Sequence, residues 1–80
     1  MTRKDFVLIA KVFRHAEEVM TAEIKAHRDS ADYDHATMRA LSSSWHANRT
    51  VARDMADALA KANPSFDRAR FLLAAIDSEV

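Results

Sequence analysis

The first third of the chain carries apolar residues at helical spacing. Between residues 3 and 28 they recur every three or four positions and form one stripe when plotted at about 100° per residue. Thr2, followed three residues later by Asp5, is typical of the capping box that begins a helix. The pattern predicts a long amphipathic helix over about 3–28. Its stripe consists of Phe6, Ile9, Phe13, Ala16, Met20 and Ile24, with Val12 beside it.

A second helical pattern covers about residues 35–61, after a polar segment in which Asp32 or Asp34 is placed to cap the helix. Its seam alternates spacings of three and four residues, and Asn48 occupies one seam position. A buried amide needs a partner, so Asn48 is expected to hydrogen-bond to a backbone carbonyl or across an interface, where it would set the register. The apolar seam residues are Met38, Leu41, Trp45, Ala52, Met55 and Leu59.

The stretch NPSFDRARFL, residues 63–72, predicts a sharp corner between two helices. Pro64 ends the second helix, because the residue before a proline is pushed out of the α region. If Asp67 caps a third helix, Phe66 and Phe71 are the two partners of a hydrophobic staple, which sets the angle at which the chain enters the helix. A short third helix is therefore expected over about 68–76. Its inward face would be Phe71, Leu72, Ala75 and Ile76.

These elements predict an all-α fold with one small domain over 1–80. The helices at about 3–28 and 35–61 form a long antiparallel hairpin, and the helix at about 68–76 folds back across one end. Two long helices and one short one leave an open side, and an isolated hairpin buries little apolar surface. We therefore expect a homodimer that completes a four-helix bundle, with a three-helix monomer as the alternative.

Composition limits the chemistry that the chain can perform. The 80 residues include neither glycine nor cysteine, so glycine-rich phosphate loops, disulfides and thiolate metal sites are excluded. Twelve basic and twelve acidic side chains cancel, so no overall charge attracts the chain to nucleic acid or membrane. The N-terminal segment lacks the apolar core of a signal peptide, and no apolar run is long enough to span a bilayer. A protein of the cytoplasm is expected.

The histidines and serines do not form a recognisable site in the sequence. Glu23 shares a helix face with His27, and Asp32 lies three residues from His35, but a zinc site needs three or four converging ligands. The run Ser42-Ser43-Ser44 lies near His46 without the strand-turn-helix elbow that presents a catalytic serine. The pair Glu17-Glu18 is expected on or beside the solvated side of its helix. We expect no metal, no cofactor and no enzymatic activity.

One row of charge on the second helix is a candidate partner-binding surface. Arg39, His46 and Arg53 recur every seven residues, and Arg49 flanks the row. The row lies roughly 140° around the helix from the apolar seam, so it is expected to face solvent. It forms either a solvated face with an Arg53–Asp57 pair or a contact surface for acidic protein or phosphate. We refer to Arg39, His46, Arg49 and Arg53 as the basic stripe.

The run ARDMADALAKANPSFDRARFLLAA, residues 52–75, resembles the C-terminal half of a group of short tailed-bacteriophage proteins. These carry the pattern Asn-Pro-x-Phe-Asp-x-x-Arg-Phe, and the opening MTRKDFVLIAKVFR and Trp45 are similar to theirs as well. The chain ends differently, without the Ala-Cys-Gly common in that group, and residues 15–44 show no such resemblance. The group has no general activity to carry over. The resemblance implies a phage protein in the bacterial host cytoplasm.

Together these observations predict a small non-enzymatic phage protein that binds a host or phage protein. The alternative is a nucleic-acid-binding module that uses the basic stripe on the second helix.

Overall fold

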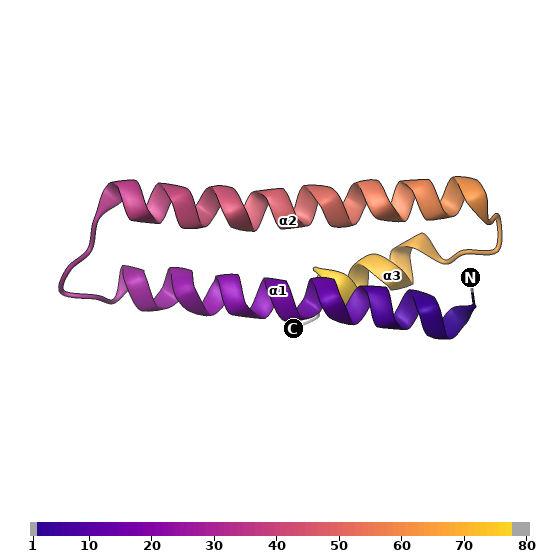
Figure 1. The fold of residues 1–80 in the computed structure, drawn as a ribbon, viewed down its shortest axis with the longest axis horizontal. Helices are drawn as coiled ribbons and strands as arrows, with labels where there is room; N and C mark the ends of the chain where they lie inside the picture. Colours follow the sequence, from indigo (N-terminus) through magenta and orange to yellow (C-terminus); the bar gives the residue numbers. More distant parts are fainter. Residues whose placement is uncertain (1, 78–80) are drawn as a thin grey trace.

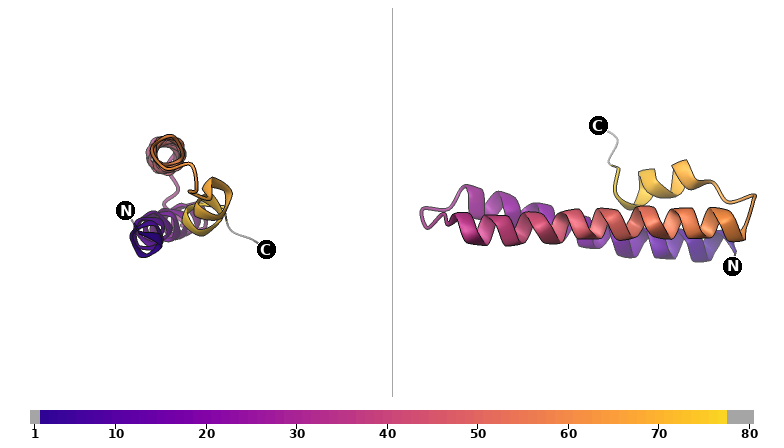
Figure 2. Two further views of the ribbon diagram at one scale, coloured as in Figure 1. Left: turned by 90° about the vertical axis from the view of Figure 1, so that its right-hand side faces the viewer. Right: turned by 90° about the horizontal axis from the view of Figure 1, so that it is seen from above.

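Three helices make up the fold in the computed structural model, which describes residues 2–77 (Figure 1). Helix α1 spans Arg3–Arg28, α2 spans His35–Ala62 and α3 spans Arg68–Ala75. The two long helices run antiparallel, and α3 folds back against the half of this hairpin that lies away from the α1–α2 turn (Figures 1 and 2). The predicted all-α architecture is confirmed, although α2 is one residue longer and α3 one residue shorter than expected. Residues 1 and 78–80 of the expected domain lie outside the described residues.

Local hydrogen bonds begin both long helices. The Thr2 hydroxyl accepts from the backbone N–H of Asp5 at 3.4 Å, and the Asp5 carboxylate accepts from the Thr2 N–H at 2.9 Å. This is the predicted capping box, with aspartate in the role of glutamate. Of the two candidate caps of α2, it is Asp34 that accepts from the Thr37 N–H, at 2.9 Å. These bonds satisfy N–H groups that have no partner within the helix.

The corner between α2 and α3 has the predicted staple. The rings of Phe66 and Phe71 lie with centroids 5.5 Å apart, and Phe66 also packs edge-on against Phe6 of α1 at 4.7 Å. The Asp67 carboxylate caps α3 by accepting from the Arg70 N–H at 3.0 Å. Asn63 closes the turn, because its side-chain oxygen accepts from the Ser65 N–H at 3.2 Å. The corner therefore anchors α3 to α1 as well as setting its direction.

The core lies where α3 crosses the hairpin. Several of its members are alanines, whose single methyl group lets the helices approach closely, and Phe71 packs edge-on against Phe13 with ring centroids 6.4 Å apart. No residue between 18 and 51 is buried, so the half of the hairpin near the α1–α2 turn has only half-covered apolar side chains. The molecule measures 48 × 19 × 19 Å. The buried apolar residues are Ala10, Ala52, Ala56, Phe71, Leu72, Ala75 and Ile76.

The stabilisation of α2 by its N-cap, Asp34, should depend on pH. Hydrogen bonds from the hydroxyl and the N–H of Thr37 lower the pKa of Asp34 below its ordinary value of 3.8. A carboxyl with a lowered folded-state pKa contributes stability above its unfolded-state pKa and loses it as pH falls through the folded value. We expect the amide proton shift of Thr37, followed by NMR, to change with a midpoint below pH 3.8. Asp34→Asn should remove this change, and a midpoint above 3.8 would contradict the assigned cap.

The cap of α3 should contribute measurably to stability. Asp67→Ala removes the acceptor for the Arg70 N–H and is expected to lower the free energy of unfolding by about 0.5–2 kcal/mol, measured by urea denaturation. Asp54→Ala is the control, because Asp54 is an exposed aspartate in the interior of α2, and it should change stability by less than about 0.5 kcal/mol. Equal losses in the two variants would show that the cap contributes nothing.

Candidate interaction surfaces

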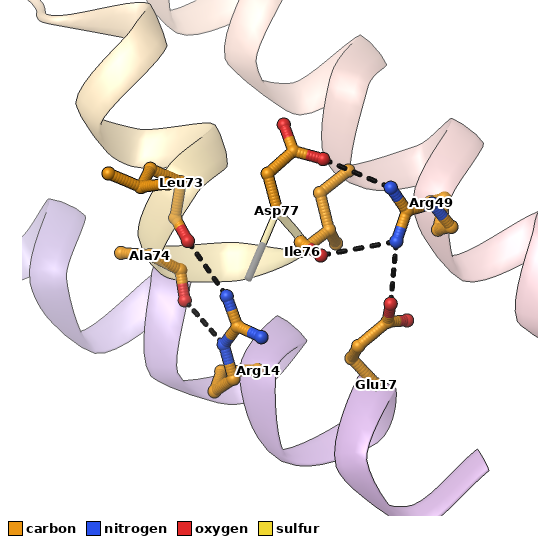
Figure 3. Close-up of polar contacts among 7 residues, drawn as sticks. All are labelled: Arg14, Glu17, Arg49, Leu73, Ala74, Ile76 and Asp77. Atoms are coloured by element: carbon orange, nitrogen blue, oxygen red, sulfur yellow. Dashed lines mark hydrogen bonds and ion pairs between the residues drawn. The ribbon is translucent and has the colours of Figure 1, made fainter. Parts of the chain in front are cut away.

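Arg49 joins all three helices at one point. Its Nη1 donates to Glu17 Oε1 of α1 at 2.6 Å and to the Ile76 carbonyl at the end of α3 at 3.1 Å (Figure 3). Its Nη2 donates to Asp77 Oδ1 at 3.0 Å, and its guanidinium lies 4.8 Å from the centroid of the Trp45 ring. A planar guanidinium can serve several acceptors at once, which a lysine ammonium does less well. We call Glu17, Arg49, Ile76 and Asp77 the Arg49 cluster.

Glu17 is the buried partner of this cluster. Its side chain is only 9% exposed, and its Oε2 has no hydrogen-bond partner among the described residues. The expectation that Glu17 lies on the solvated side of its helix is therefore wrong. The reason is its pairing with Arg49, which offsets the cost of removing the carboxylate from water. A signal was present in the sequence, because Glu17 follows the stripe residue Phe13 by four positions and precedes Ile24 by seven.

A second arginine holds the other side of α3. Arg14 of α1 donates through Nε to the Ala74 carbonyl at 2.8 Å and through Nη2 to the Leu73 carbonyl at 2.7 Å (Figure 3). The last carbonyls of a helix have no partner within it, and a cation at that end also complements the helix dipole. Arg14 therefore caps the C-terminal carbonyls of α3 from the neighbouring helix α1. The sequence contained no local signal for this role.

The structure separates the four residues of the basic stripe. Arg39, His46 and Arg53 are exposed on α2, in agreement with the predicted direction of the row. Arg49 is only 18% exposed at its side chain and belongs to the Arg49 cluster, so its placement on a solvent-facing stripe is wrong. The sequence placed Arg49 at the flank of the row, where a long side chain can turn inward once a buried carboxylate lies opposite it.

The expected ion pair between Arg53 and Asp57 does not form, because Asp57 pairs with another arginine. Asp57 Oδ1 instead accepts from Arg68 Nε at 2.6 Å, which links α2 to the first residue of α3. Both side chains are about half exposed, at 46% and 55%, so this pair adds little stability. Its effect on Arg53 is to leave that guanidinium without an ion-pair partner among the described residues.

A groove opens between α1 and α2 where α3 ends. Its volume is about 930 Å³, and its walls contain Trp45 and Ile24 together with the Arg49 cluster. His46 of the basic stripe lines it from α2, and Glu18 lines it from α1. We call this space the α1–α2 groove. Its remaining lining residues are Arg14, Thr21, Ala22 and Ser42.

A smaller groove of about 620 Å³ lies between α1 and α3. We call this space the α1–α3 groove. Its apolar lining residues are Phe6, Val7, Ala10, Phe66, Phe71 and Ala74. Its cationic lining residues are Arg3, Lys11, Arg14 and Arg70.

Asn48 does not find the expected backbone partner. Its Nδ2 is covered by other atoms and has no hydrogen-bond acceptor within residues 2–77. The apolar seam around it is as predicted, because Trp45 and Met55 are half-buried and Ala52 is fully buried. The second predicted role of Asn48, a bond across an interface, stays a prediction.

The histidines of the described residues contact a turn or lie at the surface, and they do not gather into a metal site. His27 Nε2 accepts from the Asp34 N–H at 2.9 Å, and the His27 ring stacks on Tyr33 with centroids 5.3 Å apart. No group of three or more His, Asp or Glu residues is placed to hold a metal ion within residues 2–77. Ser42 and His46 both line the α1–α2 groove, and no hydrogen bond joins them in this structure. Nor does any described helix have the length and apolar character to cross a membrane.

Replacing Arg49 should destabilise the fold. Arg49→Ala leaves the buried Glu17 carboxylate without its cation and frees the end of α3, so we expect a loss of about 2–4 kcal/mol in the free energy of unfolding. Arg53→Ala, four residues along the same helix but exposed, should change stability by less than about 0.5 kcal/mol. Thermal or urea unfolding of both variants tests this, and a small effect of Arg49→Ala would mean that the cluster does not hold α3.

No protein-family profile matches this chain, and searches of curated proteins and of solved structures likewise find no match.

Proposed function

We propose that this chain is a small non-enzymatic interaction protein and that the α1–α2 groove is its binding site for a partner protein. The observation that supports the proposal is that the groove extends the surface of the hairpin on which α3 packs. Helix α3 packs against both long helices, and the groove begins beside Ile76 and Asp77, directly after α3 ends. The hairpin therefore offers two successive positions for a third helix, and its own chain fills one of them.

The part of this surface that α3 leaves uncovered is long enough for a short helix. From Glu18 to Arg28, α1 runs beyond the Arg49 cluster for about 16 Å, which corresponds to three turns of a helix lying alongside it. Half-buried side chains such as Ile24 and Trp45 line the space, and they would gain burial from an apolar helix face. Recognition of an amphipathic helix in an apolar groove is a common mode of protein association.

Charge at the groove indicates which helix would fit. His46 lines the α2 side, and Arg39, one heptad earlier on the same face, is exposed. Glu18 lines the α1 side. The partner that these charges favour is an amphipathic helix with acidic residues along the flank that faces α2. Because arginine pairs with carboxylates through two parallel hydrogen bonds, Arg39 is suited to such a contact.

The proposed setting follows from the resemblance of residues 52–75 to short tailed-phage proteins. We place the protein in a bacterial host during phage infection, with a host or phage protein as the partner. Binding of nucleic acid through Arg39, His46 and Arg53 is the competing function, because these side chains are exposed on one face of α2. The two differ in salt dependence, since contacts to phosphate weaken steeply as salt is added.

Blocking the groove should abolish partner binding. Thr21 is exposed and lines the groove, so Thr21→Trp is expected to fill the space and reduce capture of the partner from nuclease-treated bacterial lysate at least about tenfold. Thr50→Trp is the matched control, because Thr50 is also an exposed threonine on a long helix but lines neither groove. Quantitative mass spectrometry of the captured proteins compares the variants. Undiminished capture by Thr21→Trp would show that the groove is not the site.

Charge reversal tests the basic side chains of α2 in the same assay, and nuclease and salt separate the two functions. Arg39→Glu with Arg53→Glu should reduce capture, whereas Arg3→Glu with Lys11→Glu makes the same change in net charge at the α1–α3 groove and should preserve it. If the wild-type chain retains only nucleic acid, and loses it after nuclease treatment or at high salt, the nucleic-acid function is correct and the proposed one is wrong.

A further inference from the structure

The side of the hairpin opposite α3 carries an exposed apolar surface. On α1, Val12 and Val19 lie about 160–180° around the helix from the buried Ala10, which faces α3. On α2, Val51 lies about 160° around from Arg49, which contacts the end of α3. Seen along the hairpin, α3 lies to one side of α1 and α2 (Figure 2). We call the opposite surface the apolar face; it consists of Leu8, Val12, Val19 and Ala26 of α1 and Thr37, Ala40, Ser44, Ala47, Val51 and Ala58 of α2.

The apolar face exposes large hydrophobic side chains that a lone hairpin would leave in water. Leu8 is 60% exposed, Val12 is 69% exposed and Val51 is 52% exposed. The sequence placed Val12 beside the inward stripe, so its exposure is a correction to that expectation. Val19 is exposed as well, and four of the seven large hydrophobic residues that are exposed in the described chain thus belong to this one face. Such concentration on one side is typical of an interaction surface.

The contribution of α2 to this face carries one charge, Asp54, which lies at its flank three residues after Val51 and four before Ala58. The members of the face on α2 are threonine, serine, alanine and valine, and all of them are exposed. On α1 the carboxylates of Asp5 and Glu23 lie towards the two ends, and His15 lies between Val12 and Val19. Full charges therefore lie only towards the two ends and at the Asp54 flank, and depletion of charge from the centre is typical of protein interfaces.

We propose that a second copy of this chain covers the apolar face, so that two hairpins form a four-helix bundle. The hairpin is 48 Å long and 19 Å wide, which gives one side a footprint of roughly 900 Å². A standard stable interface buries about 800 Å² of accessible surface per partner, so a contact along the whole length of the hairpin would be of comparable size. The dimer would also enlarge a core in which Ile76 is the largest fully buried side chain of the described residues.

The face is complementary to itself, which favours a second copy over another partner. In a twofold dimer the same surface must act as both halves of the contact. Here α1 supplies large residues such as Leu8 and Val12, whereas α2 supplies mainly small ones such as Ala47 and Ala58. Placing α1 of one copy on α2 of the other packs large residues against small ones, the arrangement by which helical layers interdigitate. Helix α3 and both grooves remain outside this contact.

The test is the mass of the wild-type chain and of variants in solution. Sedimentation equilibrium of the wild-type protein should give twice the 9.0 kDa mass of one chain, with dissociation on dilution. Val12→Glu and Val19→Glu each place a charge in the middle of the face and should give the mass of one chain. Val7→Glu is the matched control, because Val7 is 47% exposed but lies in the α1–α3 groove, and this variant should remain a dimer.

Each result decides the proposal. A wild-type chain that stays monomeric at all concentrations overturns it, whether or not another protein binds the face. Dimers that persist in both Val12→Glu and Val19→Glu overturn it too, because the copies would then meet elsewhere. If a glutamate variant loses helicity by circular dichroism, Val12→Thr combined with Val19→Thr keeps the branched shape and should still weaken self-association at least about tenfold. Thr21→Trp should remain dimeric, so failure of the groove proposal is distinguishable from failure of this one.

Discussion

The arrangement of the helices depends on how α3 is held against the hairpin. Two arginines hold its C-terminal end, Arg14 through the last carbonyls and Arg49 through the Ile76 carbonyl and Asp77. The buried carboxylate of Glu17 makes this arrangement specific, because it requires the guanidinium of Arg49 in one position. The staple corner anchors the other end of α3. With both ends held, an eight-residue helix that would be unstable alone is fixed in place.

This anchoring gives the two sides of the hairpin different properties. The side that carries α3 has two grooves and exposed cations, and the α1–α2 groove begins where the Arg49 cluster ends α3. The opposite side carries the apolar face. Under the two proposals, one side of each copy pairs with a second copy, while the other side presents the groove to a different protein. The surfaces do not overlap, so dimerisation would present two equivalent grooves, which strengthens binding to any partner that has two matching helices.

Much of the fold was predictable because its determinants are local. The capping box of Thr2 and Asp5, the cap at Asp67 and the staple of Phe66 and Phe71 each join residues no more than five positions apart. Helical periodicity likewise identified the inward seams of both long helices, since burial of one stripe is the main reason that such helices fold. Partners so close together can be recognised from the local sequence. The helix boundaries and the architecture could therefore be predicted from the pattern.

The candidate site was predicted less well, and the difference is one of sequence distance. Arg49 and Glu17 are 32 positions apart, and Arg14 meets the end of α3 across 59 and 60 positions. Periodicity placed Arg49 at the flank of a solvated stripe and Glu17 near solvent, because a charge with no visible partner is expected to remain in water. The sequence by itself thus determined three helices, their caps and the corner between the last two. Only the tertiary structure decided which charges are buried and which side of the hairpin stays open, because both depend on the side against which α3 packs.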